Sequence, residues 1–366
     1  MKKKSSNKSL KKAKFSKQDE FYTQLLDIER ELKHYKRHLK GKVIYCNCDD
    51  PRVSSFFHYF SYNFEKLGIK KLITTCYKNQ NMDLFSQYDS EKAIYLEYNG
   101  DKNMNNVPDA EEIGIHYLKG DGDFRSKECI ELLKEADIVV TNPPFSLFRQ
   151  YVEQLIEYEK KFVIIGNINA ITYKEIFKLI KMNKLWQGYG FKQGNAYFKT
   201  KYDHFSSDVL NQESSIVLLR NVVWFTNLEF SKRKDELILY KRYVGNEKDY
   251  PKYDNYDAIN VDRIKDIPMD YKGIMGVPIT FLQDHNPNQF KIIGLGNSRD
   301  NFTPNKDYVN PIKIMKDGER KSGNAINCVL AIETNTKPNN KIHYVSENSS
   351  YLIAPYARVL IQNQKL

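Results

Sequence analysis

The sequence of 366 residues contains no long run of apolar side chains. A transmembrane helix needs about 20 such residues, so we expect no membrane span. The N-terminal segment is basic, but no apolar stretch follows it, which argues against a secretory signal. These two absences predict a cytoplasmic protein.

Cysteine is scarce, and its pattern suits neither disulfides nor a metal centre. An odd, scattered set of five thiols is typical of a reducing compartment. Two of them form a Cys-x-Cys pair, but no second Cys or His pair follows at the spacing of a zinc site. We therefore expect free thiols and no metal. The five are Cys46, Cys48, Cys76, Cys129 and Cys328.

Acidic residues are absent from the first 17 positions, which carry eight lysines. The net charge of +11 is therefore uneven: residues 18–230 hold 28 basic and 30 acidic side chains, and residues 231–366 hold 21 and 16. Clustered lysines favour a polyanionic partner, although a solvated, disordered tail explains residues 1–17 equally well. We predict a disordered basic tail over 1–17.

Hydrophobic periodicity indicates alternating strands and helices up to about residue 230. This alternation predicts an α/β domain with a mainly parallel sheet over 18–230. Beyond it, strands become short and Gly, Pro and Asn are frequent, which predicts a smaller, loop-rich, mostly β domain over 231–366. Helices are expected at 19–40, 53–67, 127–134 and from 148, and strands at 43–46, 71–77, 93–98, 113–118, 137–141, 162–166 and 216–225. Residues 93–118 are expected to form a hairpin.

Three polar segments follow predicted strands, at 47–51, 120–124 and 142–145. Ligands of α/β sheets bind at the carboxyl ends of the strands. The sequence therefore predicts that these segments share one site.

The last of these segments is Asn142-Pro143-Pro144-Phe145. The exocyclic amino group of adenine is a poor nucleophile, and the Asn142 side chain and a carbonyl fixed by proline can accept its two hydrogens. Such fixed acceptors stabilise the positive charge that develops as a methyl group arrives. Phe145 offers a flat face for the base. An ordinary Asn-Pro turn is the alternative.

The chain resembles the EcoRI-type adenine-specific DNA methyltransferases. The resemblance covers nearly the whole sequence and rests on segments 19–23, 45–51, 141–145, 223–227 and 276–282. It implies a Rossmann-like methyltransferase domain, S-adenosylmethionine as methyl donor without a metal, and duplex DNA as substrate. It also implies a target-recognition domain at the C-terminal end.

The resemblance assigns roles to individual residues. Asn142, Pro143, Pro144 and Phe145 are the catalytic loop. Three further segments are implied to bind the cofactor. The segment 21–23 closes over its methionine end, the segment 47–51 is the loop after the first strand, and the segment 123–124 binds its adenine. In chain order these cofactor residues are Phe21, Tyr22, Thr23; Asn47, Asp49, Asp50, Pro51; and Asp123, Phe124.

Glycine is missing from the loop after the first strand, where most methyltransferases are glycine-rich. There is none between Gly41 and Gly68. The acidic residue expected after the second strand is also not apparent. A Pro-Cys dipeptide is absent too, and methylation at cytosine C5 would need one as nucleophile. The absence of this dipeptide fits the reaction that the resemblance implies, which is direct methyl transfer to the amino group of an adenine flipped out of the duplex.

Several alternatives remain at this stage. Cytosine N4, RNA bases or a glutamine side chain could be the methyl acceptor. Pro108-Asp109 with Glu159-x-Lys161 superficially resembles a metal-nuclease motif, and a non-catalytic DNA-binding protein is a third possibility. Family analogy suggests a monomer that reads a short palindrome, with a cognate restriction endonuclease encoded elsewhere.

Two sets of residues are weaker candidates. Aromatic residues that could cover the second face of the base are Tyr189, Phe191, Tyr197 and Phe198, although core packing is the commoner role of such a cluster. Basic residues that could read bases are Arg242, Arg263, Arg299, Lys306 and Arg320, although each is equally typical of a solvated surface.

Overall fold

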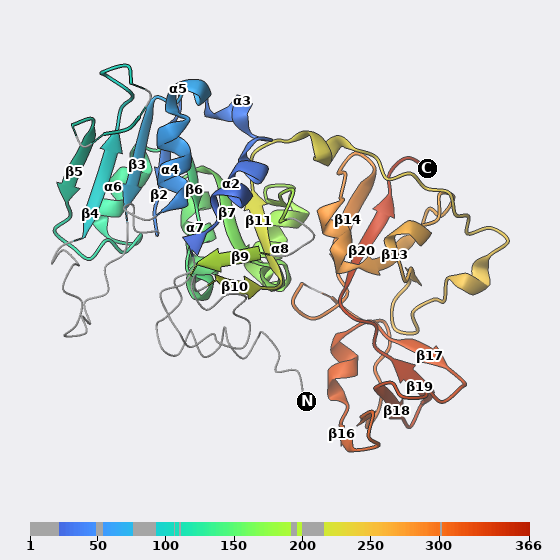
Figure 1. Cartoon of the computed structure of the whole chain (residues 1–366). Coiled ribbons are helices and arrows are strands. Elements are labelled where there is room, and N and C mark those ends of the chain that lie inside the picture. Colours follow the sequence, from blue (N-terminus) through green and yellow to red (C-terminus); the bar gives the residue numbers. More distant parts are fainter. Residues whose placement is uncertain are drawn as a thin grey trace. The chain divides into compact units, whose positions relative to one another are not determined.

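The computed structural model describes residues 22–48, 54–75, 93–105, 107–109, 111–191, 196–199, 216–300 and 302–366. The chain forms two compact units (Figure 1). The first ends at Ile171 and resumes over Leu185–Phe230, and the second comprises Thr172–Lys184 and Ser231–Leu366. Within the described ranges, no helix has both the length and the apolar character needed to cross a membrane.

An eight-stranded sheet is the centre of the first unit, in the order β5-β4-β3-β2-β6-β7-β11-β8. The four neighbours β3, β2, β6 and β7 are parallel, and antiparallel pairs flank them on both sides. The predicted mainly parallel sheet is therefore confirmed at its centre, as is the β4–β5 hairpin. The strands are β2 (Val43–Cys46), β3 (Lys71–Thr75), β4 (Ile94–Tyr98), β5 (Ile113–Tyr117), β6 (Ile138–Thr141), β7 (Lys161–Asn167), β8 (Trp186–Gln187) and β11 (Val222–Thr226).

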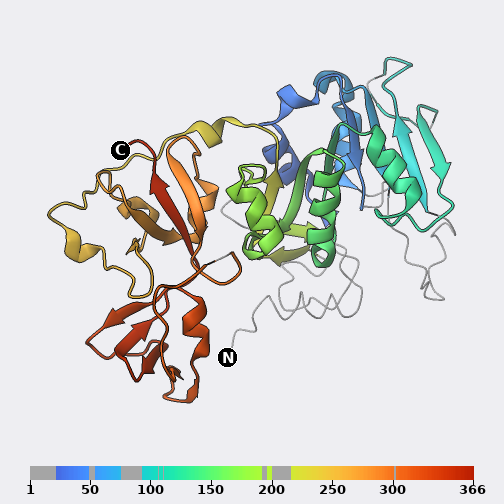
Figure 2. The ribbon, with the colours of Figure 1, turned by 180° about the vertical axis from the view of Figure 1, so that it is seen from behind.

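Helices cover both faces of this sheet. Figure 1 shows α2 and α4 in front of it, and Figure 2 shows the opposite face with α6 and α7. Helix α4 contacts β3, α6 contacts β2, and α7 contacts β7. The helices are α2 (Leu25–Leu32), α3 (Lys36–Leu39), α4 (Ser55–Tyr62), α5 (Phe64–Leu67), α6 (Lys127–Glu135) and α7 (Phe148–Glu157), and a 3-10 turn, η1 (Phe145–Leu147), precedes α7.

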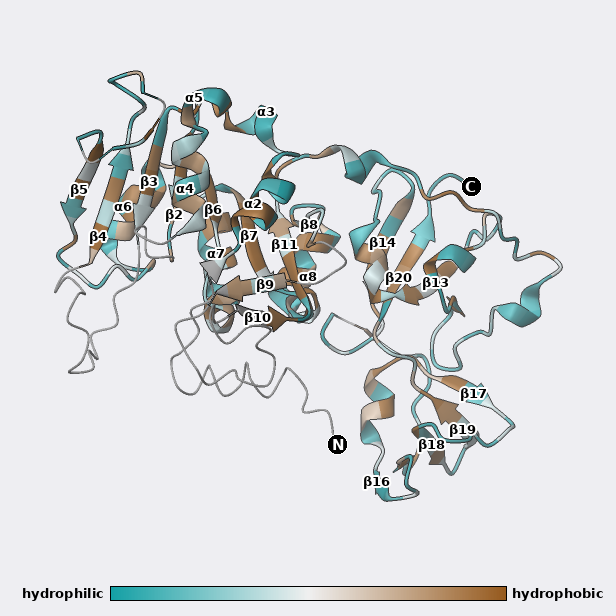
Figure 3. Ribbon diagram, viewed as in Figure 1, coloured by the Kyte–Doolittle hydropathy of each residue, from teal (hydrophilic) through white to brown (hydrophobic). Residues whose placement is uncertain are grey.

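The central strands are apolar because they are covered on both sides. All four residues of β2 and of β6 are buried, and Figure 3 shows these strands in the hydrophobic colour. Helix α7 lies very close to the sheet at Gly166. A Cβ atom there would lie 2.4 Å from the ring of Phe148, so only glycine fits. This contact fixes the start of α7, which follows the Asn142 loop.

Three sequence-based expectations were wrong in detail. The helix predicted over 53–67 is, where described, divided at Asn63 into α4 and α5. The helix predicted over 19–40 is, where described, a short strand β1 (Tyr22–Thr23) followed by α2 and α3. The cause is pairing of β1 with β9 (Ala196–Lys199) in a separate three-stranded sheet. The strand predicted over 216–225 is divided into β10 (Ile216–Leu219) and β11, which belong to different sheets. Asn221, with φ of 63°, turns the chain between them.

The described residues of the second unit form one α-helix, several 3-10 turns and two further sheets. Helix α8 (Lys174–Lys181) contacts β14. One sheet has the order β12-β13-β20-β14 and the other β16-β15-β18-β19-β17. Their strands are β12 (Ile259–Asn260), β13 (Ile274–Pro278), β14 (Phe290–Leu295), β15 (Ile312–Ile314), β16 (Arg320–Ser322), β17 (Ile332–Thr334), β18 (His343–Ser346), β19 (Ser349–Ile353) and β20 (Arg358–Asn363).

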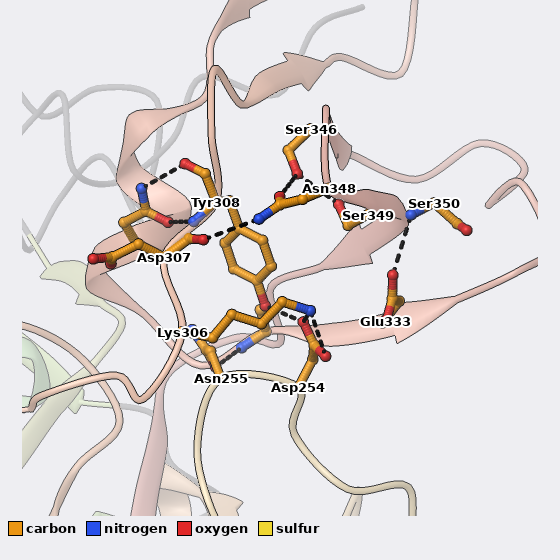
Figure 4. A network of polar contacts seen from close by, with 12 residues as sticks. Asp254, Asn255, Lys306, Asp307, Tyr308, Glu333, Ser346, Asn348, Ser349 and Ser350 are labelled. Atoms are coloured by element: carbon orange, nitrogen blue, oxygen red, sulfur yellow. Dashed lines mark hydrogen bonds and ion pairs between the residues drawn. The ribbon is translucent and has the colours of Figure 1, made fainter.

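Side-chain hydrogen bonds tie the long loops of this unit together (Figure 4). Asp254 accepts hydrogen bonds from the Lys306 ammonium at 2.7 Å and from the Tyr308 hydroxyl at 2.8 Å. Asn255 donates to the carbonyl of Val329 at 2.8 Å and accepts from the backbone N–H of Ala331 at 2.9 Å. These bonds replace part of the backbone ladder that short strands cannot provide.

Candidate active site

The predicted catalytic loop leaves the sheet at its centre. It follows β6, whose last residue, Thr141, is fully buried. Asn142 is 7% exposed and Pro143 is buried, so this end of the loop is enclosed. Pro144 has φ of −55° and ψ of 124°, an extended conformation that ends where η1 begins. The two prolines thus present Asn142 on a rigid backbone.

The loop is attached to the end of the neighbouring strand β2. The Thr141 hydroxyl donates a hydrogen bond to the backbone carbonyl of Asn47. The Asn47 side-chain oxygen accepts a second hydrogen bond from the hydroxyl of Tyr151, on α7. Burial raises the pKa of Tyr151 well above its ordinary value, so the hydroxyl stays protonated and remains a donor. Asn47 is therefore fixed from two sides.

Tyr151 also reaches the third predicted segment. The ring of Phe124 packs edge-on against the ring of Tyr151, with centroids 5.0 Å apart. Gln154, one turn further along α7, donates a hydrogen bond to the Phe124 carbonyl at 3.1 Å. Side chains of α7 therefore join the segments around Asn47 and Phe124 beside the Asn142 loop. The described residues of the three polar segments thus lie close together at the carboxyl ends of the strands, as the sequence predicted.

Sequence reasoning did not identify Tyr151 as part of this arrangement. It occupies the apolar stripe of α7, between Phe148 and Leu155, a position typical of core packing. The available signal was its hydroxyl group, since a fully buried tyrosine needs a hydrogen-bond partner.

The Asp123 carboxylate is charged and already bonded on one side. Both of its oxygens accept hydrogen bonds from the Arg125 guanidinium, at 2.8 and 2.6 Å. The bond to Arg125 holds the pKa of Asp123 below its usual value. Oδ1 also accepts from the backbone N–H of Arg125 at 2.8 Å, so the capacity that remains for a ligand amino group lies on Oδ2. Arg125 also lies over the Phe124 ring, 5.3 Å from its centroid.

The first-strand loop takes a conformation usually supplied by glycine. Cys48 has φ of 80°, a region that non-glycine residues rarely adopt. Cys48 therefore adopts this conformation in a segment whose sequence lacks glycine. Strain of this kind persists where the surrounding structure enforces it, and here the preceding residue, Asn47, is bonded to both β6 and α7.

Among the cofactor residues near the N-terminal end, Thr23 is described in full. It is 2% exposed, and its hydroxyl has no hydrogen-bond partner among the described residues. A buried hydroxyl in this state fits a polar ligand group. Only the backbone of Tyr22 is described, and Phe21, Asp49, Asp50 and Pro51 lie outside the described residues.

Two of the four aromatic candidates for the second face of the base are core residues. Phe198 is fully buried, and Phe191 is stacked on Trp224 with centroids 5.6 Å apart. Tyr189 is partly buried and stacks on His34 at 3.4 Å. Tyr197 is partly exposed. Phe145 is partly buried, with part of its surface packed against the core and part accessible.

A buried carboxylate anchors the segment that carries Tyr189. Glu31, on α2, is fully buried and accepts hydrogen bonds from the backbone N–H groups of Tyr189 and Gly190, both at 2.9 Å, and from the Tyr35 hydroxyl at 2.8 Å. Gly188 allows this close approach, since a Cβ atom there would lie 2.1 Å from the carboxylate.

The residues of the nuclease alternative do not form a metal site. Asp109 accepts hydrogen bonds from the backbone N–H groups of Glu111 and Glu112, so it caps a turn before β5. Glu159 lines a pocket of about 410 Å³ at the amino ends of the strands, where Lys42 pairs with Asp137 at 3.4 Å. Within the described parts of the chain, no group of three or more potential metal ligands occurs.

Comparison with known proteins identifies the family of this chain. The family model described as "Adenine-specific methyltransferase EcoRI" matches residues 9–364. The chain is 52% identical to the Type II methyltransferase M.EcoRI of Escherichia coli over 291 residues, which are 78% of this chain and 89% of that protein. It is 40% identical to M.MpnI of Mycoplasma pneumoniae, over 77% of this chain and 84% of that protein.

A second mycoplasma relative gives the same result. Type II methyltransferase M.MgeORF184P of Mycoplasma genitalium is 40% identical, again over 77% of this chain and 84% of that protein. No solved structure matches the chain.

Proposed function

Because the chain belongs to the family of the adenine-specific methyltransferase EcoRI, we propose that it methylates the N6 amino group of adenine in duplex DNA. The proposal makes it the modification enzyme of a restriction-modification system. The observation that carries it is the rigid loop of Asn142 and Pro143, fixed at the carboxyl end of β6 through Thr141 and Asn47.

In this proposal the side-chain oxygen of Asn142 and the Pro143 carbonyl accept the two hydrogens of the target amino group. Both acceptors are in place before the base enters, so little reorganisation is needed as positive charge develops on nitrogen. The amino nitrogen attacks the methyl carbon in line while the bond from that carbon to sulfur breaks, and the nitrogen then loses a proton. The accessible part of Phe145 covers one face of the base.

S-adenosylmethionine would supply an electrophilic methyl group on a sulfonium centre. Thr23, Asn47, Asp123 and Phe124 would hold it, together with the predicted cofactor residues outside the described ranges. The unpartnered hydroxyl of Thr23 and the charged Asp123 support this fit. The ring of Phe124, which packs against Tyr151 and lies beneath Arg125, would offer an apolar face to the cofactor's adenine.

We assign the catalytic role to the first unit and DNA recognition to the second. The sequence-based boundary at residue 231 then needs one addition, because residues 172–184 cluster with the second unit. Cytosine N4 remains a chemical alternative, since its amino group has the same two hydrogens.

Labelled methyl transfer tests the proposal. Purified protein is incubated with methyl-labelled S-adenosylmethionine and unmethylated duplex DNA, and the DNA is then digested to nucleosides. The expected product is labelled N6-methyladenine nucleoside. Label in N4-methylcytosine would keep the mechanism and change the base. If the protein binds the cofactor but no label appears in DNA, the proposal that DNA is the methyl acceptor is refuted.

A further inference from the structure

The segment Ile238–Val244 of the second unit carries unusually exposed apolar side chains. The exposed fractions are 89% for Ile238, 59% for Tyr240 and 68% for Val244. Isoleucine is among the residues most often buried, and single exposed apolar residues are common, but three within seven positions are not. Met269, which is 39% exposed, joins them, because its backbone N–H donates to the Lys241 carbonyl at 2.9 Å.

This segment is firmly held despite its exposure. The buried side chain of Gln289 accepts from the backbone N–H of Leu237 and donates to its carbonyl, both at 2.8 Å. At the other end, the Asp270 carboxylate accepts from the backbone N–H of Tyr243 at 2.6 Å. Exposure alternates along the extended chain between these anchors: Leu239 is partly buried, whereas Ile238 and Tyr240 are exposed. The apolar side chains are therefore displayed on a fixed backbone.

The charge of the segment is of one sign. It contains Lys241 and Arg242 and no acidic residue, and neither forms an ion pair within 4 Å among the described residues. The Asp270 carboxylate attracts Arg242 from a longer distance. The Lys241 ammonium lies over the ring of Tyr240, 5.8 Å from its centroid. Other basic candidates of this unit differ, since Arg263 pairs with Asp266 at 2.6 Å and Lys306 pairs with Asp254 at 2.7 Å. Duplex DNA presents anionic phosphates, which attract cations, and thymine methyl groups in its major groove, which can contact apolar side chains. The segment offers both kinds of side chain next to each other.

We propose that Ile238–Val244 is a docking surface for duplex DNA, with Lys241 and Arg242 on phosphates and Ile238 and Tyr240 against apolar groups in the groove. This assignment rests on the proposed function, because it takes DNA as the substrate. It gives these side chains a purpose that neither the core nor the hydrogen-bond network of the unit supplies.

The electrostatic half of the proposal is tested by the salt dependence of binding. The probe is a fluorescent duplex that the wild-type protein methylates, and its affinity is measured by anisotropy across a salt series. The double variant Lys241→Gln, Arg242→Gln should lose two phosphate contacts. Each contact contributes about 0.9 to the slope of log affinity against log salt concentration, so the slope should become less steep by about 1.8. The control pair Lys66→Gln with Lys70→Gln, exposed on the first unit, should leave the slope unchanged.

The apolar half is tested at one salt concentration. Ile238→Ser with Tyr240→Ser should weaken binding at least about tenfold, the equivalent of about 1.4 kcal/mol, without changing the salt slope. Val309→Ser, at a position 49% exposed in the same unit, is the matched control. Sedimentation of the wild-type protein and the variants measures self-association, and so tests whether a second copy of the chain binds this surface instead.

The outcomes distinguish a failure of the proposed function from a failure of the docking surface. A wild-type protein that transfers no methyl group to DNA refutes the proposed function itself. A wild-type protein that methylates DNA, with both double variants binding as it does, refutes only the docking surface. Loss of self-association in the Ile238 and Tyr240 variant, at unchanged DNA affinity, would also overturn it and assign the surface to a dimer contact.

Discussion

Each unit contains a network of polar side chains, buried in the first unit and partly exposed in the second, and the two networks differ in what they position. In the first unit, Thr141 and Tyr151 bind Asn47 at the carboxyl ends of adjacent parallel strands, where a complete sheet already secures the fold. In the second, Asp254 binds Lys306 and Tyr308 between long loops, next to the hydrogen bonds that Asn255 makes. The same kinds of hydrogen bond thus position a site in one unit and maintain the fold in the other.

The largest expected effect separates chemistry from folding in the first unit. Asn142→Ala should lower the rate of methyl transfer at least about a hundredfold, because it removes one preorganised acceptor. DNA binding and the midpoint of thermal unfolding should change little. Single-turnover kinetics measures the first quantity, and anisotropy and calorimetry measure the others.

The matched control is Ser146→Ala, at an exposed position of η1. It should transfer methyl groups at the wild-type rate. Joint loss of DNA binding and folded stability in Asn142→Ala would instead give Asn142 a structural role.

The second unit should behave in the opposite way. Asp254→Ala should lower the free energy of unfolding by about 2 kcal/mol, because it leaves the buried Tyr308 hydroxyl and the Lys306 ammonium without their acceptor. Urea unfolding checks this value. The exposed neighbour Asp307→Ala is the control and should be close to wild type. Equal stability of the two variants would contradict the structural role of the network.

An intermediate effect is expected where the first network meets α7. Tyr151→Phe should cost about 1 kcal/mol of stability and lower the rate of methyl transfer about fivefold, because Asn47 loses one of its two restraints. Tyr158→Phe, at the end of the same helix, should do neither. A stability loss without any change in rate would make Tyr151 a core residue only.

The smallest effect concerns pH. The pKa of Asp123 is lowered by Arg125, so its charged form, and the stability that the pair contributes, persist at neutral pH and are lost on acidification through that pKa. Arg125→Gln should raise the pKa of Asp123, so the loss of cofactor affinity on acidification should begin at a higher pH. Calorimetric titration across a pH series measures this. An unchanged limb would show that the cofactor does not depend on the charge of Asp123.

The sequence predicted the first unit better than the second for a physical reason. Strands such as β2 and β6 are apolar on both faces, and the polar segments after them mark one edge of the sheet, so Asn47, Asp123 and Asn142 could be placed together. The role of Tyr151 was missed, because a tyrosine in an apolar stripe looks like any other core residue.

The second unit has no comparable periodicity. Its loops are joined by pairs far apart in the chain, such as Asp254 with Lys306, and local patterns do not encode such pairs. The exposed residues Ile238 and Tyr240 were also missed, because their sequence looks like a strand. Only the exposed fractions show which side chains face outwards.

The most direct test of the central claim is whether excess cofactor rescues two variants differently. The claim is that Asn142 serves the base and Asp123 serves the cofactor at one edge of the sheet. Single-turnover methyl transfer is measured for Asn142→Ala and Asp123→Ala over rising S-adenosylmethionine. The account predicts that Asp123→Ala approaches the wild-type rate at saturation, whereas Asn142→Ala stays slow. Rescue of Asn142→Ala by cofactor, or failure to rescue Asp123→Ala, would contradict it.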